Sequence, residues 1–178
     1  MELQETGIKD CYIIKPKVFE DTRGYFFESY NAQTFNEQTG LTVNFVQDNQ
    51  SFSTYGVIRG LHAQAEPYAQ AKLVRVLQGE VLDVAVDVRV GSPTYGQHVA
   101  VRLSAENKLQ FFIPRGFLHG FAVLSETAEF FYKCDNFYHK DSETGVLYNS
   151  PVLGIDWLIP ERMRIISDKD RELPVFGS

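Results

Sequence analysis

The sequence predicts an all-β domain of the sandwich or jelly-roll class. Short apolar runs, separated by residues typical of turns, follow one another along the chain, which is the pattern of many-stranded β domains. The clearest run repeats with a period of two, and helical periodicity is scarce. The pattern alone leaves the topology open between a jelly roll and an immunoglobulin-type sandwich.

The strand signals begin with the strongest, the run 81–90. Its even-numbered positions are all Leu or Val, whereas Asp83, Asp87 and Arg89 fall on the other face. Turn-forming residues at 91–94 end this run. The other predicted strands are 24–29, 43–47, 71–77, 99–103, 110–113, 120–123 and 128–134.

Two short helical segments interrupt the strand pattern. Asn31 is a good N-cap for a helix that runs through Gln38, and Gly40 is a natural stop. A second short helical turn is expected over 167–172. No repeat or low-complexity linker divides the 178 residues, so we expect a single domain over 1–178 with a few short helices.

Charge and cysteine content narrow the function classes. A formal net charge of -6 argues against nucleic-acid binding, although a local basic cluster can still hold an anionic small ligand. Cys11 and Cys134 form no CxxC motif, which predicts free thiols in a reducing compartment. The polar segment 1–10 has no signal-peptide core, and no apolar run approaches the roughly 20 residues of a membrane helix. We therefore expect a cytoplasmic protein without a membrane partner.

His62 is the first candidate for proton transfer. On a regular strand it shares a face with Ile58 and Gly60, which predicts an enclosed imidazole with space beside it. Histidine is the side chain best suited to take a proton near neutral pH. A core histidine with satisfied hydrogen bonds is the alternative interpretation.

Tyr132 is the second candidate. Alternation places it on one face with Phe130 and Cys134, whereas Glu129 and Lys133 mark the other face as exposed to water. Its hydroxyl therefore points inward, either as a proton donor or as a buried group bonded to the backbone.

Several basic side chains could bind an anion. Lys72 shares an apolar face with Val74 and Val76, where it could balance developing negative charge or snorkel to water. The candidate phosphate ligands are Arg23, Arg59 and Arg75.

Arg59 and His62 have opposite parity, so a regular strand would point them to opposite faces. A bulge at Gly60, or the end of the strand there, would bring both to one side.

His119 lies next to Gly120 where a loop enters a strand, a place where histidines often line sites. A metal-binding jelly roll would offer an H-x-H pair with a nearby Glu, and neither His62 nor His119 is part of such a motif. We therefore expect no metal. Phosphate-binding, dinucleotide-binding and hydrolase motifs are also missing from the sequence.

Longer strings, with their order and spacing, resemble the dTDP-4-dehydrorhamnose 3,5-epimerase family of cupin-like sugar epimerases over about 13–174. The most specific strings are DTRGYFFE at 21–28, FVQDNQS at 45–51, VIRGLH at 57–62, QAKLVRV at 70–76, PRGFLHGF at 114–121, YKC at 132–134 and SDKD at 167–170.

The resemblance implies a double-stranded β-helix jelly roll that acts as a homodimer without a metal or redox cofactor. It implies His62 as the base, Asp170 as the carboxylate that supports it, Tyr132 as the acid on the opposite face of the sugar and Lys72 beside the keto oxygen. The matching substrate-contact positions are Arg23, Glu28, Gln47, Asp48, Asn49, Arg59, His119, Glu143 and Lys169, with Tyr138 near the nucleotide base. Arg23 and Glu28 tend to serve the neighbouring subunit's site in this family.

The implied substrate is a dTDP-linked 4-keto-6-deoxy sugar. Epimerisation at C3 and C5 of dTDP-4-dehydro-6-deoxy-D-glucose would supply dTDP-L-rhamnose for cell-surface polysaccharide such as O-antigen. Alternatives are inversion at C3 or C5 alone, a ketoisomerase of the same fold, and a non-catalytic nucleotide-sugar-binding jelly roll. Three departures from the family pattern bear on the exact sugar: Ala63 in place of an aromatic residue, Tyr148 in place of Trp, and a longer run at 156–160.

Overall fold

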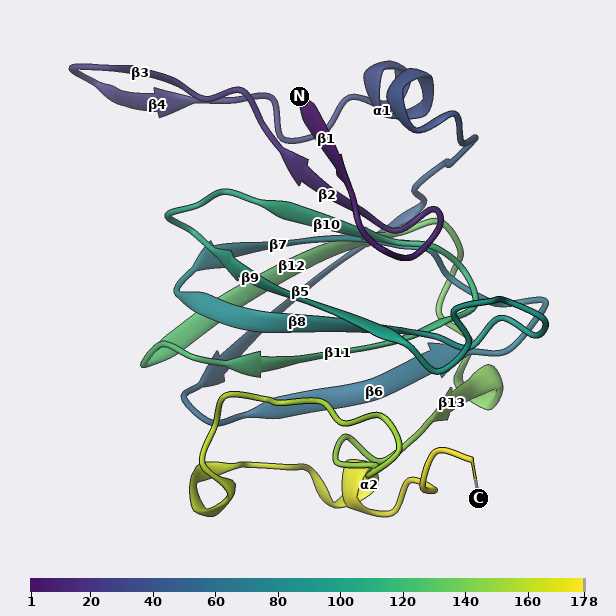
Figure 1. Cartoon of the computed structure of the whole chain (residues 1–178). Coiled ribbons are helices and arrows are strands. Elements are labelled where there is room, and N and C mark those ends of the chain that lie inside the picture. Colours follow the sequence, from purple (N-terminus) through teal and green to yellow (C-terminus); the bar gives the residue numbers. More distant parts are fainter. Residues whose placement is uncertain (178) are drawn as a thin grey trace.

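Two antiparallel sheets face one another in the computed structural model, which describes residues 1–177 (Figure 1). The first sheet contains, in spatial order, β1 (Glu2–Glu5), β2 (Tyr12–Lys15), β10 (Gln110–Ile113), β7 (Lys72–Gln78), β12 (Thr127–Cys134) and β5 (Gln47–Thr54). The second contains β13 (Glu143–Gly145), β6 (Ile58–Gln64), β11 (Phe117–Val123), β8 (Glu80–Asp87) and β9 (His98–Ser104). The fold is a jelly roll, which the family resemblance implies and which the strand pattern alone left open.

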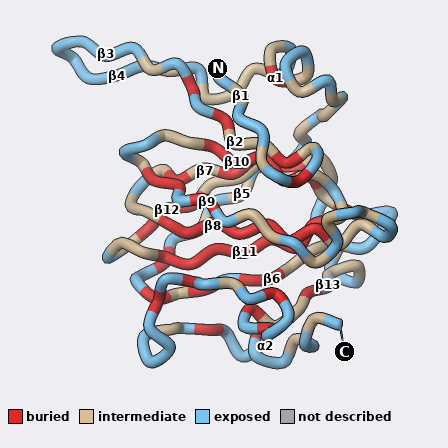
Figure 2. The backbone as a smooth tube through the Cα atoms, viewed as in Figure 1, coloured by how far each residue is buried: buried red, intermediate tan, exposed pale blue. Residues whose placement is uncertain are grey.

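The core lies between the two sheets, and both contribute buried residues to it (Figure 2). Val74 and Phe130 project from the first sheet, and Phe121 of the second stacks on Phe130 with ring centroids 4.2 Å apart. Burying side chains of this size stabilises a domain by roughly 1.5–3 kcal/mol each. This core fills one part of the interior and leaves the rest to the pocket described below.

Strand β8 confirms the predicted alternation and corrects its end. Val81 and Ala85 face the core, whereas the even-numbered residues Leu82 to Val86 pack on the outside of the sheet. The strand stops at Asp87, not at residue 90, and Val90 is 99% exposed. Asp87 ends it because its buried carboxylate accepts hydrogen bonds from Ser92 and Thr94 at 2.6 Å, which folds the following turn back on itself.

The C-terminal segment forms an outer layer over the second sheet (Figure 1). Trp157 is fully buried there and donates its indole N–H to the carbonyl oxygen of Tyr148 at 2.8 Å. The same segment carries a short 3-10 helix (Glu161–Met163) and α2 (Asp168–Arg171), while another (Lys140–Ser142) precedes β13. Ser167 caps α2 by accepting from the Asp170 N–H, so the predicted helical turn is confirmed.

Helix α1 (Ala32–Thr39) lies on the outside of the first sheet, with Phe35 edge-on against Phe112 at 5.1 Å. Both predicted caps are confirmed, since Asn31 accepts from the Thr34 N–H and Gly40 adopts the left-handed conformation with φ +69°.

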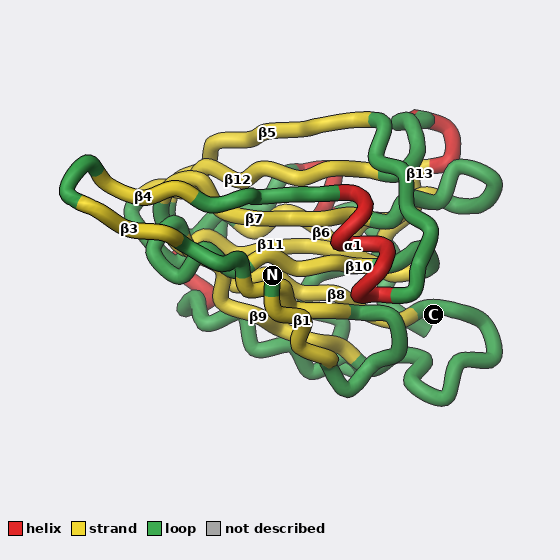
Figure 3. The backbone as a smooth tube through the Cα atoms, turned by 90° about the horizontal axis from the view of Figure 1, so that it is seen from above, coloured by secondary structure: helices red, strands yellow, loops and turns green. Residues whose placement is uncertain are grey.

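A hairpin of β3 (Phe19–Asp21) and β4 (Gly24–Phe26) projects away from the body of the molecule (Figures 1 and 3). Its aromatic side chains Phe19, Tyr25 and Phe26 are exposed. Large apolar side chains grouped on a projecting arm are characteristic of surfaces that contact another chain.

The remaining differences from the predicted strands have local causes. Residues 43–46 are not a strand, because Phe45 instead packs against Tyr30 and Phe35. The strand predicted over 24–29 ends at Phe26, and that predicted over 120–123 begins at Phe117. Strands 71–77, 99–103, 110–113 and 128–134 are confirmed within one residue at each end.

Cys11 and Cys134 are buried and free, as predicted. Across residues 1–177, no helix is long and apolar enough to cross a membrane.

Candidate active site

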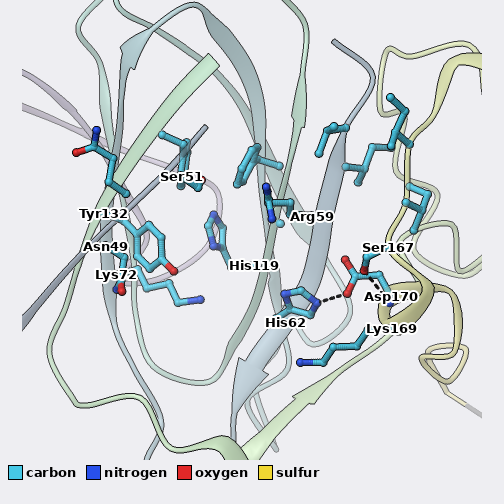
Figure 4. A pocket seen from close by; sticks show the side chains of 18 residues that line it. Asn49, Ser51, Arg59, His62, Lys72, His119, Tyr132, Ser167, Lys169 and Asp170 are labelled. Carbon is cyan, nitrogen blue, oxygen red and sulfur yellow. Dashed lines mark hydrogen bonds and ion pairs between the residues drawn. The ribbon is translucent and has the colours of Figure 1, made fainter. Parts of the chain in front are cut away.

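A cavity of about 640 Å³ opens between the two sheets. Strands β5, β7 and β12 form one wall, β6 and β11 the other, and residues 165–170 of the C-terminal segment close the side (Figure 4). The polar residues that line it are Asn49, Gln50, Ser51, Arg59, His62, Lys72, His119, Tyr132, Ser167, Lys169 and Asp170.

His62 and Asp170 form a hydrogen-bonded pair in the wall of this cavity (Figure 4). The His62 Nε2 lies 2.7 Å from Asp170 Oδ1, and Asp170 is only 4% exposed. Burial disfavours the charged carboxylate, but hydrogen bonds from His62, the Gly60 N–H and Ser167 outweigh that effect and hold the pKa of Asp170 below its usual range. An ionised carboxylate at Nε2 fixes the ring tautomer and leaves Nδ1 to accept a proton.

A bulge at Gly60 brings Arg59 and His62 to the same cavity, as hypothesised from their parity. His62 lies opposite His119 and Arg59 lies opposite Phe121, so β6 carries one more residue than β11 between these pairs. Gly60 has φ +126°, and a Cβ there would meet the Gly120 Cα at 2.6 Å. Only glycine fits this close approach of two strands.

Tyr132 and Lys72 come from the neighbouring strands β12 and β7 on the opposite wall, and Figure 4 shows both pointing into the cavity towards His62. The Lys72 Nζ lies 5.8 Å from the centre of the Tyr132 ring. Burial raises the pKa of Tyr132 to about 12 and lowers that of Lys72. The phenol therefore keeps its proton at neutral pH, and the inward orientation predicted for Tyr132 is confirmed.

His119 of β11 lines the cavity and pairs with Asp83, which was not predicted as part of the site. Its Nε2 lies 3.1 and 3.0 Å from the two carboxylate oxygens of Asp83. Burial lowers the pKa of His119, and the negative charge of Asp83 opposes that effect only in part. A signal existed, because the alternation in 81–90 placed Asp83 on the face shared by Val81 and Ala85.

The mouth of the cavity carries a polar network. Glu143 Oε2 accepts hydrogen bonds from the Tyr138 hydroxyl at 3.2 Å and from the Lys169 ammonium. Gln47 bridges to the same region, since its Oε1 accepts from the Tyr138 N–H and its Nε2 donates to Asn49 Oδ1. These five residues, all predicted from the family resemblance to lie at the substrate, are thus close to one another in the fold.

The Arg59 guanidinium donates hydrogen bonds to oxygen atoms of β5. Its Nε donates to Ser53 Oγ at 3.1 Å, which steadies a guanidinium at the edge of the cavity. Ser51 and Ser167 also line the cavity and were not predicted, because isolated serines give no sequence signal for a site.

Four predicted ligands lie away from this cavity. Asp48 is on the opposite face of β5 and pairs with Lys133 at 2.9 Å. Arg23 pairs with Asp21 near the hairpin tip, and Glu28 accepts from Asn31 beside α1. Arg75 lies on the outer face of β7, 5.7 Å from the ring centres of Phe27 and Phe131, so its prediction as a phosphate ligand of this cavity is wrong.

The residues that depart from the family pattern lie behind the site. Ala63 packs into the outer cluster on the face of β6 opposite His62, and Tyr148 belongs to the same cluster beside Trp157. Neither lines the cavity. Within the described part of the chain, no group of three or more His, Cys, Asp or Glu side chains could hold a metal ion.

Comparisons with known proteins agree with one another. A family model described as dTDP-4-dehydrorhamnose 3,5-epimerase matches residues 5–178. A dTDP-4-dehydrorhamnose 3,5-epimerase of Shigella flexneri is 56% identical over 170 residues, which cover 96% of this chain and 93% of that protein.

Solved structures of the same family are similar to this chain in both fold and sequence. The crystal structure of dTDP-4-dehydrorhamnose 3,5-epimerase from Elizabethkingia anophelis NUHP1 has a TM-score of 0.96 and 61% identity, covering 99% of this chain and 96% of that chain. A dTDP-6-deoxy-D-glucose-3,5-epimerase from Legionella pneumophila Philadelphia 1, in complex with dTDP-4-keto-L-rhamnose, has a TM-score of 0.94 and 51% identity, covering 98% of this chain and 92% of that chain.

The bulge at Gly60 generates a stability prediction. We expect Gly60→Ala to lose at least about 2 kcal/mol more unfolding free energy than Gly24→Ala, because only the former forces two strands apart. Gly24 is a matched control, since it has the same φ of +126° and open space around its Cβ position. Urea denaturation followed by circular dichroism measures both. Equal losses would contradict the steric role of Gly60.

Proposed function

This chain belongs to the dTDP-4-dehydrorhamnose 3,5-epimerase family, and we propose that it converts dTDP-4-dehydro-6-deoxy-D-glucose into dTDP-4-dehydro-L-rhamnose. The enzyme is accordingly an isomerase. The observation that carries the proposal is the placement of a histidine–aspartate pair and a protonated tyrosine on facing walls of one cavity. Inversion of a carbon centre needs a base and an acid on opposite faces of the sugar.

The reaction begins with proton removal beside the ketone. The 4-keto group acidifies the hydrogens at C3 and C5, and His62 takes one of them at Nδ1 while Asp170 holds the ring. The electron pair moves onto the keto oxygen to form an enolate. The ammonium of Lys72 stabilises that oxygen, since it projects into the same cavity.

Reprotonation completes the inversion. Tyr132 delivers a proton to the carbon from the opposite face, and the enolate returns to the ketone. A phenol with a raised pKa is a weak acid, yet a carbanion-like carbon is basic enough to accept its proton. His62 then loses the abstracted proton to water and Tyr132 regains one, and repetition of both transfers at the second carbon gives the 3,5-epimer.

The cavity mouth suits the nucleotide. Arg59 and Lys169 are the cations that line it, and guanidinium and ammonium groups both bind phosphate oxygens. Tyr138 is exposed beside them and can stack on the base, with Gln47, Asn49, Glu143 and His119 as further polar contacts. Asp48 remains a proposed contact from the family resemblance, although its carboxylate pairs with Lys133 on the other face of β5.

We further propose that two copies of the chain form the working enzyme, a homodimer in the cytoplasm that supplies dTDP-L-rhamnose for cell-surface polysaccharide such as O-antigen. The projecting hairpin supports this arrangement. Arg23 is 88% exposed in its side chain and lies outside its own cavity, next to the exposed rings of Tyr25 and Phe26. Arg23 and Glu28 would then reach the site of the neighbouring subunit.

Hydrogen exchange tests the proposed reaction. We expect proton NMR in deuterated water to show deuterium entering both C3 and C5 of dTDP-4-dehydro-6-deoxy-D-glucose, with the L-sugar trapped by a downstream reductase. His62→Ala should abolish exchange while dTDP binding remains. Deuterium at one carbon would instead indicate a single-centre epimerase, and no exchange with the wild-type chain would favour a binding protein.

Subunit mixing tests the shared site. Arg23→Ala and His62→Ala, each inactive alone, should recover about a quarter of wild-type activity when co-expressed, because half the dimers are mixed and each mixed dimer holds one intact site. The matched control is His62→Ala with Asp170→Asn, whose defects lie in the same subunit's site and should show no recovery. A lack of recovery in the first mixture would place Arg23 in its own subunit's site.

A further inference from the structure

A second buried carboxylate lies beneath the cavity, and the proton transfers described above do not use it. Asp83 is fully buried, on the core-facing side of β8 between Val81 and Ala85. Its two oxygens lie 3.0 and 3.1 Å from the His119 Nε2. Within residues 1–177, His119 is the sole hydrogen-bond partner of this carboxylate. A buried charge with so few donors is costly unless another cation is close.

The pairing fixes the tautomer of His119. A carboxylate can only accept hydrogen bonds, so the Nε2 facing it must carry the proton. Burial lowers the pKa of His119. The electrostatic effects of Lys72 on β7 and His62 on β6 lower it further, whereas Asp83 on β8 raises it. The ring is therefore neutral, with Nδ1 as its remaining acceptor.

Lys72 is the cation that needs this carboxylate. It makes no ion pair within 4.0 Å with any side chain of residues 1–177, and burial lowers its pKa. The groups that oppose this effect are Cys134 on β12, Asp83 on β8 and Glu143 on β13. Burial raises the pKa of the Cys134 thiol to about 11, so it is uncharged at neutral pH, and Glu143 is already paired with Lys169 at the mouth. Asp83 is the buried negative charge that remains.

We propose that Asp83 is a positioning residue of this site, which fixes His119 as the Nε2-protonated tautomer and holds Lys72 in its ammonium form. The inference rests on the proposed function for the roles of His119 and Lys72 in the reaction. The site then has two histidine–aspartate pairs with different tasks, one in the wall of the cavity and one that extends beneath it. Asp170 prepares His62 to take a proton, and Asp83 fixes the charge states of His119 and Lys72.

The tautomer of His119 can be measured directly in the full chain. Nitrogen-15 NMR of the histidine rings at pH 8, assigned with His119→Gln, should show His119 protonated at Nε2 and unprotonated at Nδ1. We expect Asp83→Asn to retain that tautomer, because the amide oxygen still accepts from Nε2, and Asp83→Ala to lose it. A proton on Nδ1 of His119 in the wild-type chain would overturn the proposal.

The charge on Lys72 has a kinetic signature. Asp83→Asn should lower kcat about tenfold or more at neutral pH with KM for the sugar nucleotide nearly unchanged. The alkaline limb of its pH profile should move down by roughly one pH unit, because Lys72 loses its proton more readily without the neighbouring anion. A folded Asp83→Asn variant with the wild-type pH profile would overturn this part.

Asp87→Asn is the matched control. Asp87 is equally buried on the same strand, but its carboxylate binds Arg89, Ser92 and Thr94 away from the cavity. Its loss should change stability and leave the His119 tautomer and the pH profile as they are. Failure of the proposed function would appear as no hydrogen exchange by the wild-type chain, whereas failure of this inference would appear in the tautomer and the pH profile.

Discussion

The hydrogen bond between His62 and Asp170 is the contact on which the site depends, because it joins the second sheet to the C-terminal segment. A carboxylate that is 4% exposed remains ionised only where donors surround it. One of these donors, the Gly60 N–H, belongs to the bulge that also turns Arg59 into the cavity. Asp170 itself is carried there by the outer layer, which Trp157 anchors. The orientation of the base His62 therefore depends on both the bulge at Gly60 and the outer layer, because both hold Asp170 in place.

Burial then affects the charge states of the two groups that face this pair. It raises the pKa of Tyr132 and lowers the pKa of Lys72. It keeps the Tyr132 phenol protonated, which an acid requires, and it works against the ammonium of Lys72, which an enolate requires. An enclosed cavity therefore needs a negative charge that keeps Lys72 protonated. That charge must not occupy the ammonium group in place of the keto oxygen of the substrate. A carboxylate placed below the cavity, outside reach of the sugar, satisfies both demands.

Alternation along single strands could be predicted from the sequence, whereas contacts between distant segments could not. The faces of β8 and the inward direction of Tyr132 follow from a period of two, and the caps of α1 follow from Asn31 and Gly40. Strand β5 is too polar to give an apolar signal, because its inward face lines a cavity. Asp83 meets His119 across 36 residues, and the outward position of Asp48 depends on a register that only the fold defines.

The central claim is that base and acid act from opposite faces, and Tyr132→Phe tests it most directly. Reaction of this variant in deuterated water reports both steps. Incorporation of deuterium into the sugar needs only the base, whereas inversion of the carbon centre also needs the acid. The account predicts that deuterium enters with retained configuration while inversion falls by about a hundredfold or more. Inversion at the wild-type rate would contradict it.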